Sequence, residues 1–265
     1  MAVYTTIDNP ELYFQCKLYS GNNTSQSITL DGSEDMEPNM VWIKERNGTE
    51  DHCIFDAVRG STKRISPNTT GAEWDSATNV TSFDSDGFSV GSSDQLNDSG
   101  NTQVAWCWKA SGSTASNTNG TNITSTVDAN TTSGFSIVSW TGDNSGSSTV
   151  GHGLGKTAEF VAIKNRADSA NWQVKHKNNS ANASQSLDAA DAESSRAGST
   201  NGGIADLSGT TTFGFIAGSA GVPAANGSSD AMIAYVWNSV QGFSSIGTYE
   251  GNNNADGTFV YTGFS

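Results

Sequence analysis

Apolar and polar residues alternate in short runs along this chain, and stretches rich in Ser, Thr, Asn and Gly separate the runs. In residues 104–108 and 160–164 successive side chains would point to opposite faces of a strand, so that one set meets a core. No long segment has the 3.6-residue period of an amphipathic helix. A short helix is expected at residues 187–196, where Ala, Asp and Glu cluster. The pattern therefore predicts a mainly β protein.

The alternating runs occur in matching pairs. The run MVWIKER at residues 40–46 returns as FVAIKNR at 160–166, with Lys and Arg at the same two places. Two further pairs follow in the same order: GFSVG at 87–91 with GFIAG at 214–218, and VAWCW at 104–108 with IAYVW at 233–237. A third element appears three times, as FQCKLYSGN at 14–22, FSIVSWTGD at 135–143 and FSSIGTYEGN at 243–252. We interpret these matches as an internal duplication.

The order of the matches divides the chain into five parts. They are an N-terminal arm (1–11), a first β-sandwich repeat (12–110), a Ser/Thr/Asn/Gly-rich linker (111–133), a second β-sandwich repeat (134–238), and a C-terminal segment (239–265). Frequent Asp-Gly and Asn-Gly pairs are typical of tight turns between short strands. We therefore predict an all-β fold of two tandem β-sandwich units of jelly-roll or lectin-like type.

The C-terminal segment stops before any strand of the VxIK type, so it is a partial third repeat. Two explanations remain open. Either the protein evolved from a longer array and ends here, or the segment is a tail that completes a sheet in an earlier unit or in a neighbouring chain.

Charge and hydropathy exclude two classes of partner. The formal net charge is −14, the pI is about 4.4, and the 13 basic residues are scattered, whereas nucleic-acid binding needs clustered Lys and Arg. The N-terminus has neither a basic region nor an apolar region of the kind found in signal peptides. No apolar run approaches the length of a membrane span. We expect a protein made in the cytoplasm without membrane insertion.

Candidate catalytic and metal-binding motifs are weak. The loop GHGLGKT at residues 151–157 lacks the first Gly of a phosphate-binding loop, because Val150 occupies that place, so we expect a Gly-rich connection into the next strand. Asp84 and Asp86 lack the remaining ligands of a calcium loop and predict a β-turn. His52, His152 and His176 have no metal-ligand spacing. We predict no enzyme activity, no catalytic residue, no cofactor and no metal site.

Cysteine and tryptophan carry the remaining predictions. Cys16, Cys53 and Cys107 are expected to be buried free thiols, because three cysteines cannot make a complete disulfide framework. Five of the seven tryptophans fall in the repeated strands, where core packing explains them. Trp74 and Trp172 fall between those strands. They are the candidate surface aromatics, which would stack on sugar rings.

Several of these motifs together resemble a module of virion structural proteins from marine, cyanophage-like tailed bacteriophages, which are described as tail-fibre-like. The matching runs are VWIK at 41–44, FDAVRG at 55–60, TSFDSDGF at 81–88, VAWCWKA at 104–110, FSIV at 135–138 and VGHGLG at 150–155. The second unit departs from the module because it has no clear copy of FDAVRG.

The resemblance implies a non-enzymatic structural protein located in the virion, in a tail fibre or another appendage that attaches to the host. Fibre-like proteins are generally trimeric, so it also implies a homotrimer with other tail or capsid proteins as partners. Two alternatives stay open: a capsid decoration or head-fibre protein, and a lectin-like module that binds a host surface glycan.

Overall fold

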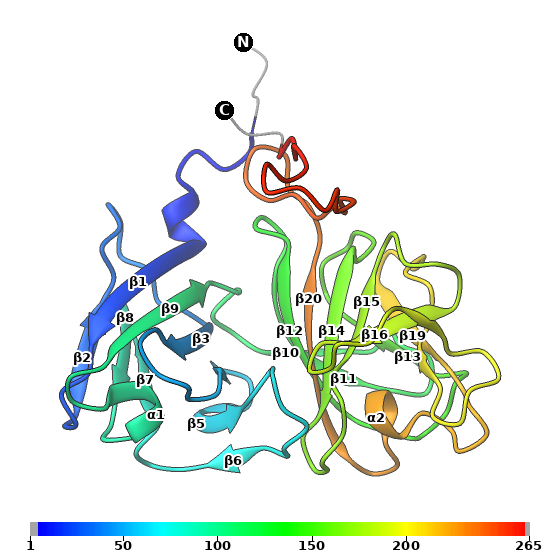
Figure 1. Cartoon of the computed structure of the whole chain (residues 1–265). Helices are drawn as coiled ribbons and strands as arrows, with labels where there is room; N and C mark the ends of the chain where they lie inside the picture. Colours follow the sequence, from blue (N-terminus) through cyan, green and yellow to red (C-terminus); the bar gives the residue numbers. More distant parts are fainter. Residues whose placement is uncertain (1–4, 263–265) are drawn as a thin grey trace.

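The structure, a computed structural model, describes residues 5–262 and consists of antiparallel sheets in two halves (Figure 1). Strands make up 38% of the chain and helices 4%, so the prediction of an all-β sandwich fold is confirmed. Each half is a β-sandwich in which a large sheet packs on a three-stranded sheet. Residues 1–4 of the predicted arm and 263–265 of the predicted tail lie outside the described residues.

The first unit combines a six-stranded sheet with a three-stranded sheet. The large sheet has the order β1 (Phe14–Ser20), β9 (Thr102–Trp108), β3 (Met40–Glu45), β4 (Cys53–Asp56), β5 (Gly60–Ile65) and β6 (Trp74–Asp75). The small sheet has the order β2 (Gln26–Thr29), β8 (Gly87–Val90) and β7 (Val80–Asp84). A 3₁₀ turn at Pro10–Leu12 precedes β1, and the short helix α1 (Asp94–Asn97) precedes β9.

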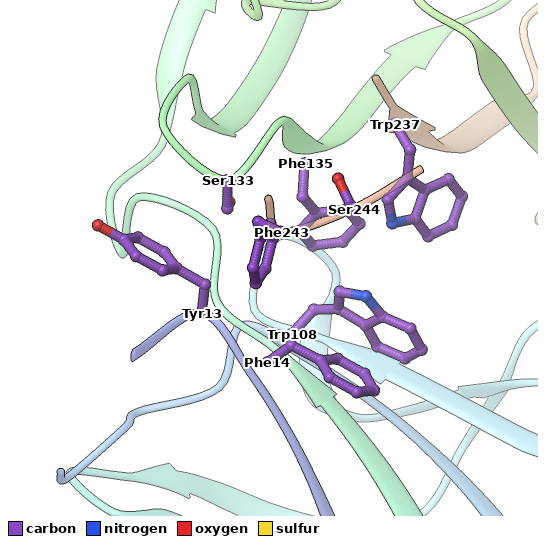
Figure 2. Close-up of a pocket in the computed structure, with 8 residues that line it drawn as sticks. All are labelled: Tyr13, Phe14, Trp108, Ser133, Phe135, Trp237, Phe243 and Ser244. Carbon is purple, nitrogen blue, oxygen red and sulfur yellow. The ribbon is translucent and has the colours of Figure 1, made fainter. Parts of the chain in front are cut away.

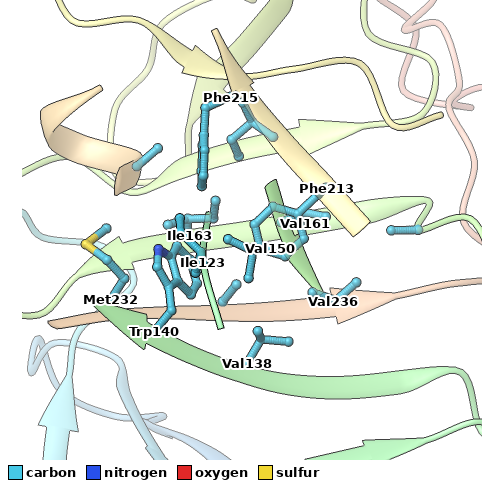
Figure 3. Close-up of a cluster of buried hydrophobic side chains, with 14 of the residues drawn as sticks. Ile123, Val138, Trp140, Val150, Val161, Ile163, Phe213, Phe215, Met232 and Val236 are labelled. Carbon is cyan, nitrogen blue, oxygen red and sulfur yellow. The ribbon is translucent and has the colours of Figure 1, made fainter. Parts of the chain in front are cut away.

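The second unit combines an eight-stranded sheet with a three-stranded sheet. The large sheet has the order β10 (Ala115–Asn117), β11 (Ser125–Asn130), β12 (Phe135–Thr141), β20 (Ala231–Trp237), β14 (Phe160–Asn165), β15 (Gln173–His176), β16 (Ala183–Ser186) and β17 (Ser194–Ser195). The small sheet has the order β13 (Thr149–Gly151), β19 (Thr212–Ile216) and β18 (Gly203–Ile204). Helix α2 (Pro223–Asn226) precedes β20, and Figure 3 shows Trp140, Phe213 and Phe215 in the core of this unit.

The matched sequence runs occupy matched places in the two units. Strands β1, β9 and β3 are neighbours in the first large sheet, and β12, β20 and β14 are neighbours in the second. The recurring lysine makes the same hydrogen bond in both units. Lys44 Nζ donates to the carbonyl oxygen of Glu45, and Lys164 Nζ donates to the carbonyl oxygen of Asn165. Burial lowers the pKa of Lys164 to about 8. The common strand order agrees with the duplication, which remains an inference.

Alternate residues of the central strands face different layers. On β20, Met232 and Val236 belong to the core of the second unit, whereas Ile233 and Tyr235 belong to a separate apolar cluster that also contains Met40 of the first unit. A strand that is buried on both faces loses the strict polar alternation and becomes apolar throughout. The two large sheets therefore pack against each other, and the junction between the units is a third hydrophobic core.

A buried polar network crosses this junction. Asp56 on β4 forms an ion pair with Arg59, and both side chains are fully buried. The hydroxyl of Tyr235, on the second unit, donates to Asp56 at 2.6 Å. Arg59 also pairs with Glu73 at 3.1 Å, and Glu73 accepts two hydrogen bonds from Arg166 of the second unit. Burial opposes the charge of Arg59, but Asp56, Tyr235 and Glu73 hold its pKa above the ordinary value.

This network explains why the run FDAVRG occurs once. Its Asp56 and Arg59 face the second unit, where they meet Tyr235. The two units contribute different surfaces to their junction. Only the first unit therefore needs the acidic and basic pair, and the second unit contributes Tyr235.

The prediction that residues 111–133 form a linker is wrong. These residues contain β10 and β11, which extend the second large sheet, and Ile123 and Val127 are buried in the core of the second unit. The stretch looks like a linker because Ser, Thr and Asn dominate it, yet a strand of an antiparallel sheet that has one solvent-exposed face needs few apolar residues. The second unit thus begins before residue 134.

The predicted helix at 187–196 is also wrong. Residues 194–195 form β17, and none of the ten residues is helical. The segment has no apolar face with a helical period, so nothing favours burying it as a helix. The backbone N–H of Arg196 instead donates to the carbonyl oxygen of Asn182, beside β16.

The third copy of the repeated element is not a strand. Its described part makes one isolated bridge, between Val240 and Ser244, and residues 245–262 are without regular secondary structure. The tail therefore completes no sheet of this chain within the described residues. Completion of a sheet in a neighbouring chain stays a prediction.

Cysteine burial follows the prediction at two positions. Cys53 and Cys107 are buried free thiols in the core of the first unit, and burial raises the pKa of Cys53 to about 12. Cys16 is exposed, contrary to the prediction. On the edge strand β1 the inward position belongs to its neighbour Gln15, whose amide binds the backbone of the arm and the following loop.

Candidate functional site

Trp74 is the most exposed tryptophan side chain described, at 61%. It lies on β6, a two-residue strand at the edge of the first large sheet, directly opposite Arg64 on β5. The Arg64 guanidinium carbon is 5.8 Å from the centre of the indole ring, within the range of a cation–π contact. This contact holds a large apolar ring at the surface of an otherwise polar edge.

A polar groove of about 390 Å³ lies beside this ring. It is lined by Arg64, Trp74, Ser76, Thr78, Asn79, Ser92, Ser93, Asp94 and Gln95. The volume is in the range of small-molecule sites. Every lining residue except Trp74 offers hydroxyl, amide, guanidinium or carboxylate groups, and the buried Oε1 atom of Gln95 has no hydrogen-bond partner. One apolar ring beside many hydrogen-bonding groups is the combination that a sugar ring requires.

Backbone hydrogen bonds join the two segments that line the groove, residues 76–79 and 92–95. The N–H of Gly91 donates to the carbonyl oxygen of Asn79, and the N–H of Ser93 donates to that of Thr78. A side chain at position 91 would place its Cβ 2.6 Å from the Thr78 carbonyl oxygen, so glycine is required there. The Asn79 amide donates to the carbonyl oxygen of Thr62 and fastens the groove to β5.

Trp172 is buried, unlike Trp74, so the prediction that it is a surface aromatic is wrong. Its side chain has 0% exposure and packs in the junction between the units. The indole Nε1 donates to the carbonyl oxygen of Ser66 at 2.9 Å, and the ring stacks on Tyr235 with 6.3 Å between centroids. The sequence places both tryptophans between repeated strands, and only the packing of the two units separates them.

Another groove is larger but has different chemistry. Its volume is about 680 Å³ and its lining residues are Ala72, Asn165, Ala167, Asp168, Ser169, Ala170, Asn171, Asn201, Pro223 and Ala224. It has no aromatic ring for stacking. The Trp74 groove is therefore the better candidate for a glycan.

An aromatic pocket of about 220 Å³ opens at one end of the junction between the units (Figure 2). It is lined by Tyr13, Phe14, Trp108, Ser133, Phe135, Trp237, Phe243 and Ser244. Figure 2 shows Phe14 and Trp108 from the first unit facing Phe135 and Trp237 from the second, with Phe243 beside them. Its apolar walls make it suitable for an apolar group.

The Gly-rich loop at residues 151–157 behaves as predicted, because it connects β13 to β14 and no helix follows it. Its His152 is fully buried. The Nδ1 atom accepts a hydrogen bond from the backbone N–H of Leu154 at 3.3 Å, and Nε2 has no partner. The imidazole is thus held in a site that disfavours a positive charge.

This burial predicts a loss of stability in weak acid. It lowers the pKa of His152 from 6.5 to about 4. Between these values the unfolded chain binds the proton and the folded chain does not, so this group decreases the free energy of unfolding as the pH falls, by up to about 3 kcal/mol. In His152→Gln, urea unfolding at pH 7 and pH 4.5 should give a smaller difference than in the wild type. The partly exposed His52→Gln should change this difference less, and an unchanged difference in His152→Gln would contradict the assignment.

The acidic turn has a structural role. Asp84 ends β7 and Asp86 lies in the tight turn that leads to β8, as the predicted β-turn requires. The Asp84 carboxylate accepts hydrogen bonds from Ser82 and Ser89, and Asp86 accepts one from the backbone of Met36. Within residues 5–262 no group of three or more His, Cys, Asp or Glu side chains is arranged to hold a metal ion. In the same part of the chain no helix has the length and hydropathy of a membrane span.

The sequence profile of a family described as "Domain of unknown function (DUF7483)" matches residues 9–265, which include both units and the tail. No curated protein and no solved structure matches the chain.

Proposed function

From the premise that the chain belongs to the family described as a domain of unknown function (DUF7483), whose profile spans both units, we propose a single function for the whole chain. It is a non-enzymatic structural protein of a tailed-phage virion, in a tail fibre or another appendage that attaches to the host. The resemblance of its repeated strands to virion structural proteins supports the structural part. The exposed Trp74 above its polar groove supports the attachment part, and it is the observation that carries the proposal.

The ligand that fits this groove is a host surface glycan. The apolar face of a sugar ring stacks on an exposed aromatic ring, and its hydroxyl groups need donors and acceptors around the ring. Trp74 supplies the ring, Arg64 supplies donors, and Asp94 supplies an acceptor. The firmly packed sheets beneath hold these groups in place, as expected of a binding site on a rigid scaffold.

Replacing Trp74 with Ala should weaken glycan binding at least about tenfold, because a central aromatic side chain commonly carries much of the binding energy. A glycan array of bacterial surface polysaccharides would first identify a ligand, and titration calorimetry would then compare the dissociation constants. Leu18→Ala is the matched control. Leu18 is 55% exposed and lies on β1, at the opposite edge of the same sheet.

The attachment proposal fails if the array shows no ligand, or if Trp74→Ala and the wild type bind the ligand equally well. A separate measurement tests the location. Electron cryomicroscopy of the intact particle should show tail-proximal density in multiples of three or six copies. An icosahedral array on the head would replace the appendage with a capsid decoration protein.

A further inference from the structure

The aromatic pocket brings together the same residue of all three sequence repeats. Phe14, Phe135 and Phe243 each begin one copy of the repeated element, and all three line this pocket. In the first two units the phenylalanine lies opposite a tryptophan on the neighbouring strand, at 4.9 Å between centroids for Phe14 and Trp108 and 5.3 Å for Phe135 and Trp237. The pocket is thus a meeting point of two aromatic pairs and one further phenylalanine.

Phe243 has no tryptophan of this kind. Its ring contact within the described chain is with Tyr13, in an edge-to-face arrangement with 6.0 Å between the ring centroids. The space beside it has a volume of about 220 Å³. A cavity of about 150 Å³ accommodates benzene. The pocket therefore has room for one more aromatic side chain.

The same chain carries aromatic side chains that nothing covers. Tyr249, Phe259 and Tyr261 are 72%, 88% and 78% exposed. Half of the large exposed hydrophobic residues of the described chain lie in the tail between residues 249 and 261. Such a concentration of exposed apolar surface marks an interaction site.

The tail folds back on itself, and its exposed aromatic side chains do not enter the aromatic pocket of the same chain. The Asn252 amide donates to the carbonyl oxygen of Gly257 at 2.7 Å, and the Thr258 hydroxyl donates to that of Glu250. These bonds close a loop that holds Tyr249, Val260 and Tyr261 together around a small surface hollow. The exposed rings of this loop are thus available to another molecule.

We propose that the pocket receives an aromatic side chain from the tail of a second copy of this chain. In Figure 1 the red tail lies at the end of the junction where β1 begins and β20 ends, and the residues there, Tyr13, Phe14 and Trp237, line the pocket. Copies that meet at this end can each place their tail in the pocket of the next copy, and such a head-to-tail contact closes into a ring of identical subunits. The homotrimer expected from the sequence resemblance is one such ring. The net charge of −14 on each copy opposes assembly, so added salt strengthens it.

Sedimentation of the full chain in 0.5 M NaCl tests the proposal. The wild type should form a discrete oligomer, and the triple variant Tyr249→Ser, Phe259→Ser, Tyr261→Ser should raise its dissociation constant at least about 100-fold. The replaced side chains are exposed, so the fold should persist. Leu18→Ser and Trp74→Ala are controls that keep the oligomer, and the second control separates this inference from the glycan proposal. A wild type that stays monomeric, or a triple variant that assembles equally well, overturns the inference.

Photo-cross-linking identifies the occupant of the pocket. The wild-type chain labelled with ¹⁵N is mixed with an unlabelled Tyr261→p-benzoylphenylalanine variant and irradiated. The proposal expects cross-links from position 261 to ¹⁵N peptides that contain Trp108, Trp237 or Phe243. Cross-links only to unlabelled peptides would show that each tail enters its own pocket, and cross-links elsewhere would place the tail on another surface; either result overturns the inference.

Discussion

Replacing Asp56 with Ala should lower the free energy of unfolding by about 3–5 kcal/mol. The carboxylate is fully buried, pairs with Arg59, and accepts a hydrogen bond from the hydroxyl of Tyr235 at 2.6 Å. Its removal leaves the Arg59 guanidinium buried with Glu73 as its remaining acidic partner, and it leaves the tyrosine hydroxyl without this acceptor. Urea unfolding followed by tryptophan fluorescence would measure the change.

A surface ion pair provides the control for this prediction. Lys17 pairs with Asp31, whose side chain is 75% exposed. Exposed pairs contribute about 0–1 kcal/mol, so Asp31→Ala should change the free energy of unfolding by less than 1 kcal/mol or so. A loss below about 1 kcal/mol in Asp56→Ala as well would show that the buried network does not stabilise the junction.

The network also predicts how the two units unfold. Tyr235 belongs to the second unit and Asp56 to the first, and the junction between them has its own apolar core. Asp56→Ala should therefore decrease the cooperativity between the units as well as the stability. A second transition that appears in the variant but not in the wild type would be the sign of this decoupling.

Replacing Trp172 with Ala should lower the free energy of unfolding by about 3–5 kcal/mol, because it opens a cavity in the junction core. The ring has 0% exposure, and its Nε1 hydrogen bond to Ser66 is lost as well. Trp74→Ala removes the same side chain from the surface and should change stability by about 0.5 kcal/mol or less. Thermal and urea unfolding of the two variants would compare one residue type in two environments.

Equal losses from the two tryptophan variants would contradict the structure, because they would mean that both rings are equally buried. In the glycan titration the two variants should differ in the opposite direction, because there Trp74→Ala has the larger effect. There Trp74→Ala should be impaired, and a folded Trp172→Ala protein should bind as well as the wild type at a temperature where it stays folded.

The large elements of the fold were predictable from the sequence because each is encoded locally. The runs at residues 40–46 and 160–166 became β3 and β14, and the runs at 104–108 and 233–237 became β9 and β20. Alternation identifies a strand without knowledge of its partner. The weak motifs were also assessed correctly in their local form, since the loop at 151–157 and the turn at Asp84 are ordinary connections.

The wrong predictions concern residues whose environment is provided by distant parts of the chain. Residues 111–133 look like a linker until β12 offers an edge for β11 to pair with. Cys16 has a buried-looking position on β1, but Gln15 takes the inward side. Trp74 is exposed, and no signal in the sequence indicated the groove residues Asn79, Asp94 and Gln95 beside it.

The sequence by itself determined the all-β class and the repeated strands, since alternation and repetition act over a few residues. Only the tertiary structure decided that the two units share a core, that Asp56 meets Tyr235 across it, and that Trp172 is buried while Trp74 is not. It also brought Phe14, Phe135 and Phe243 to one pocket. The physical reason is that two apolar faces in the sequence of a strand predict burial on both sides. Which surface covers the second face depends on how the sheets pack against each other.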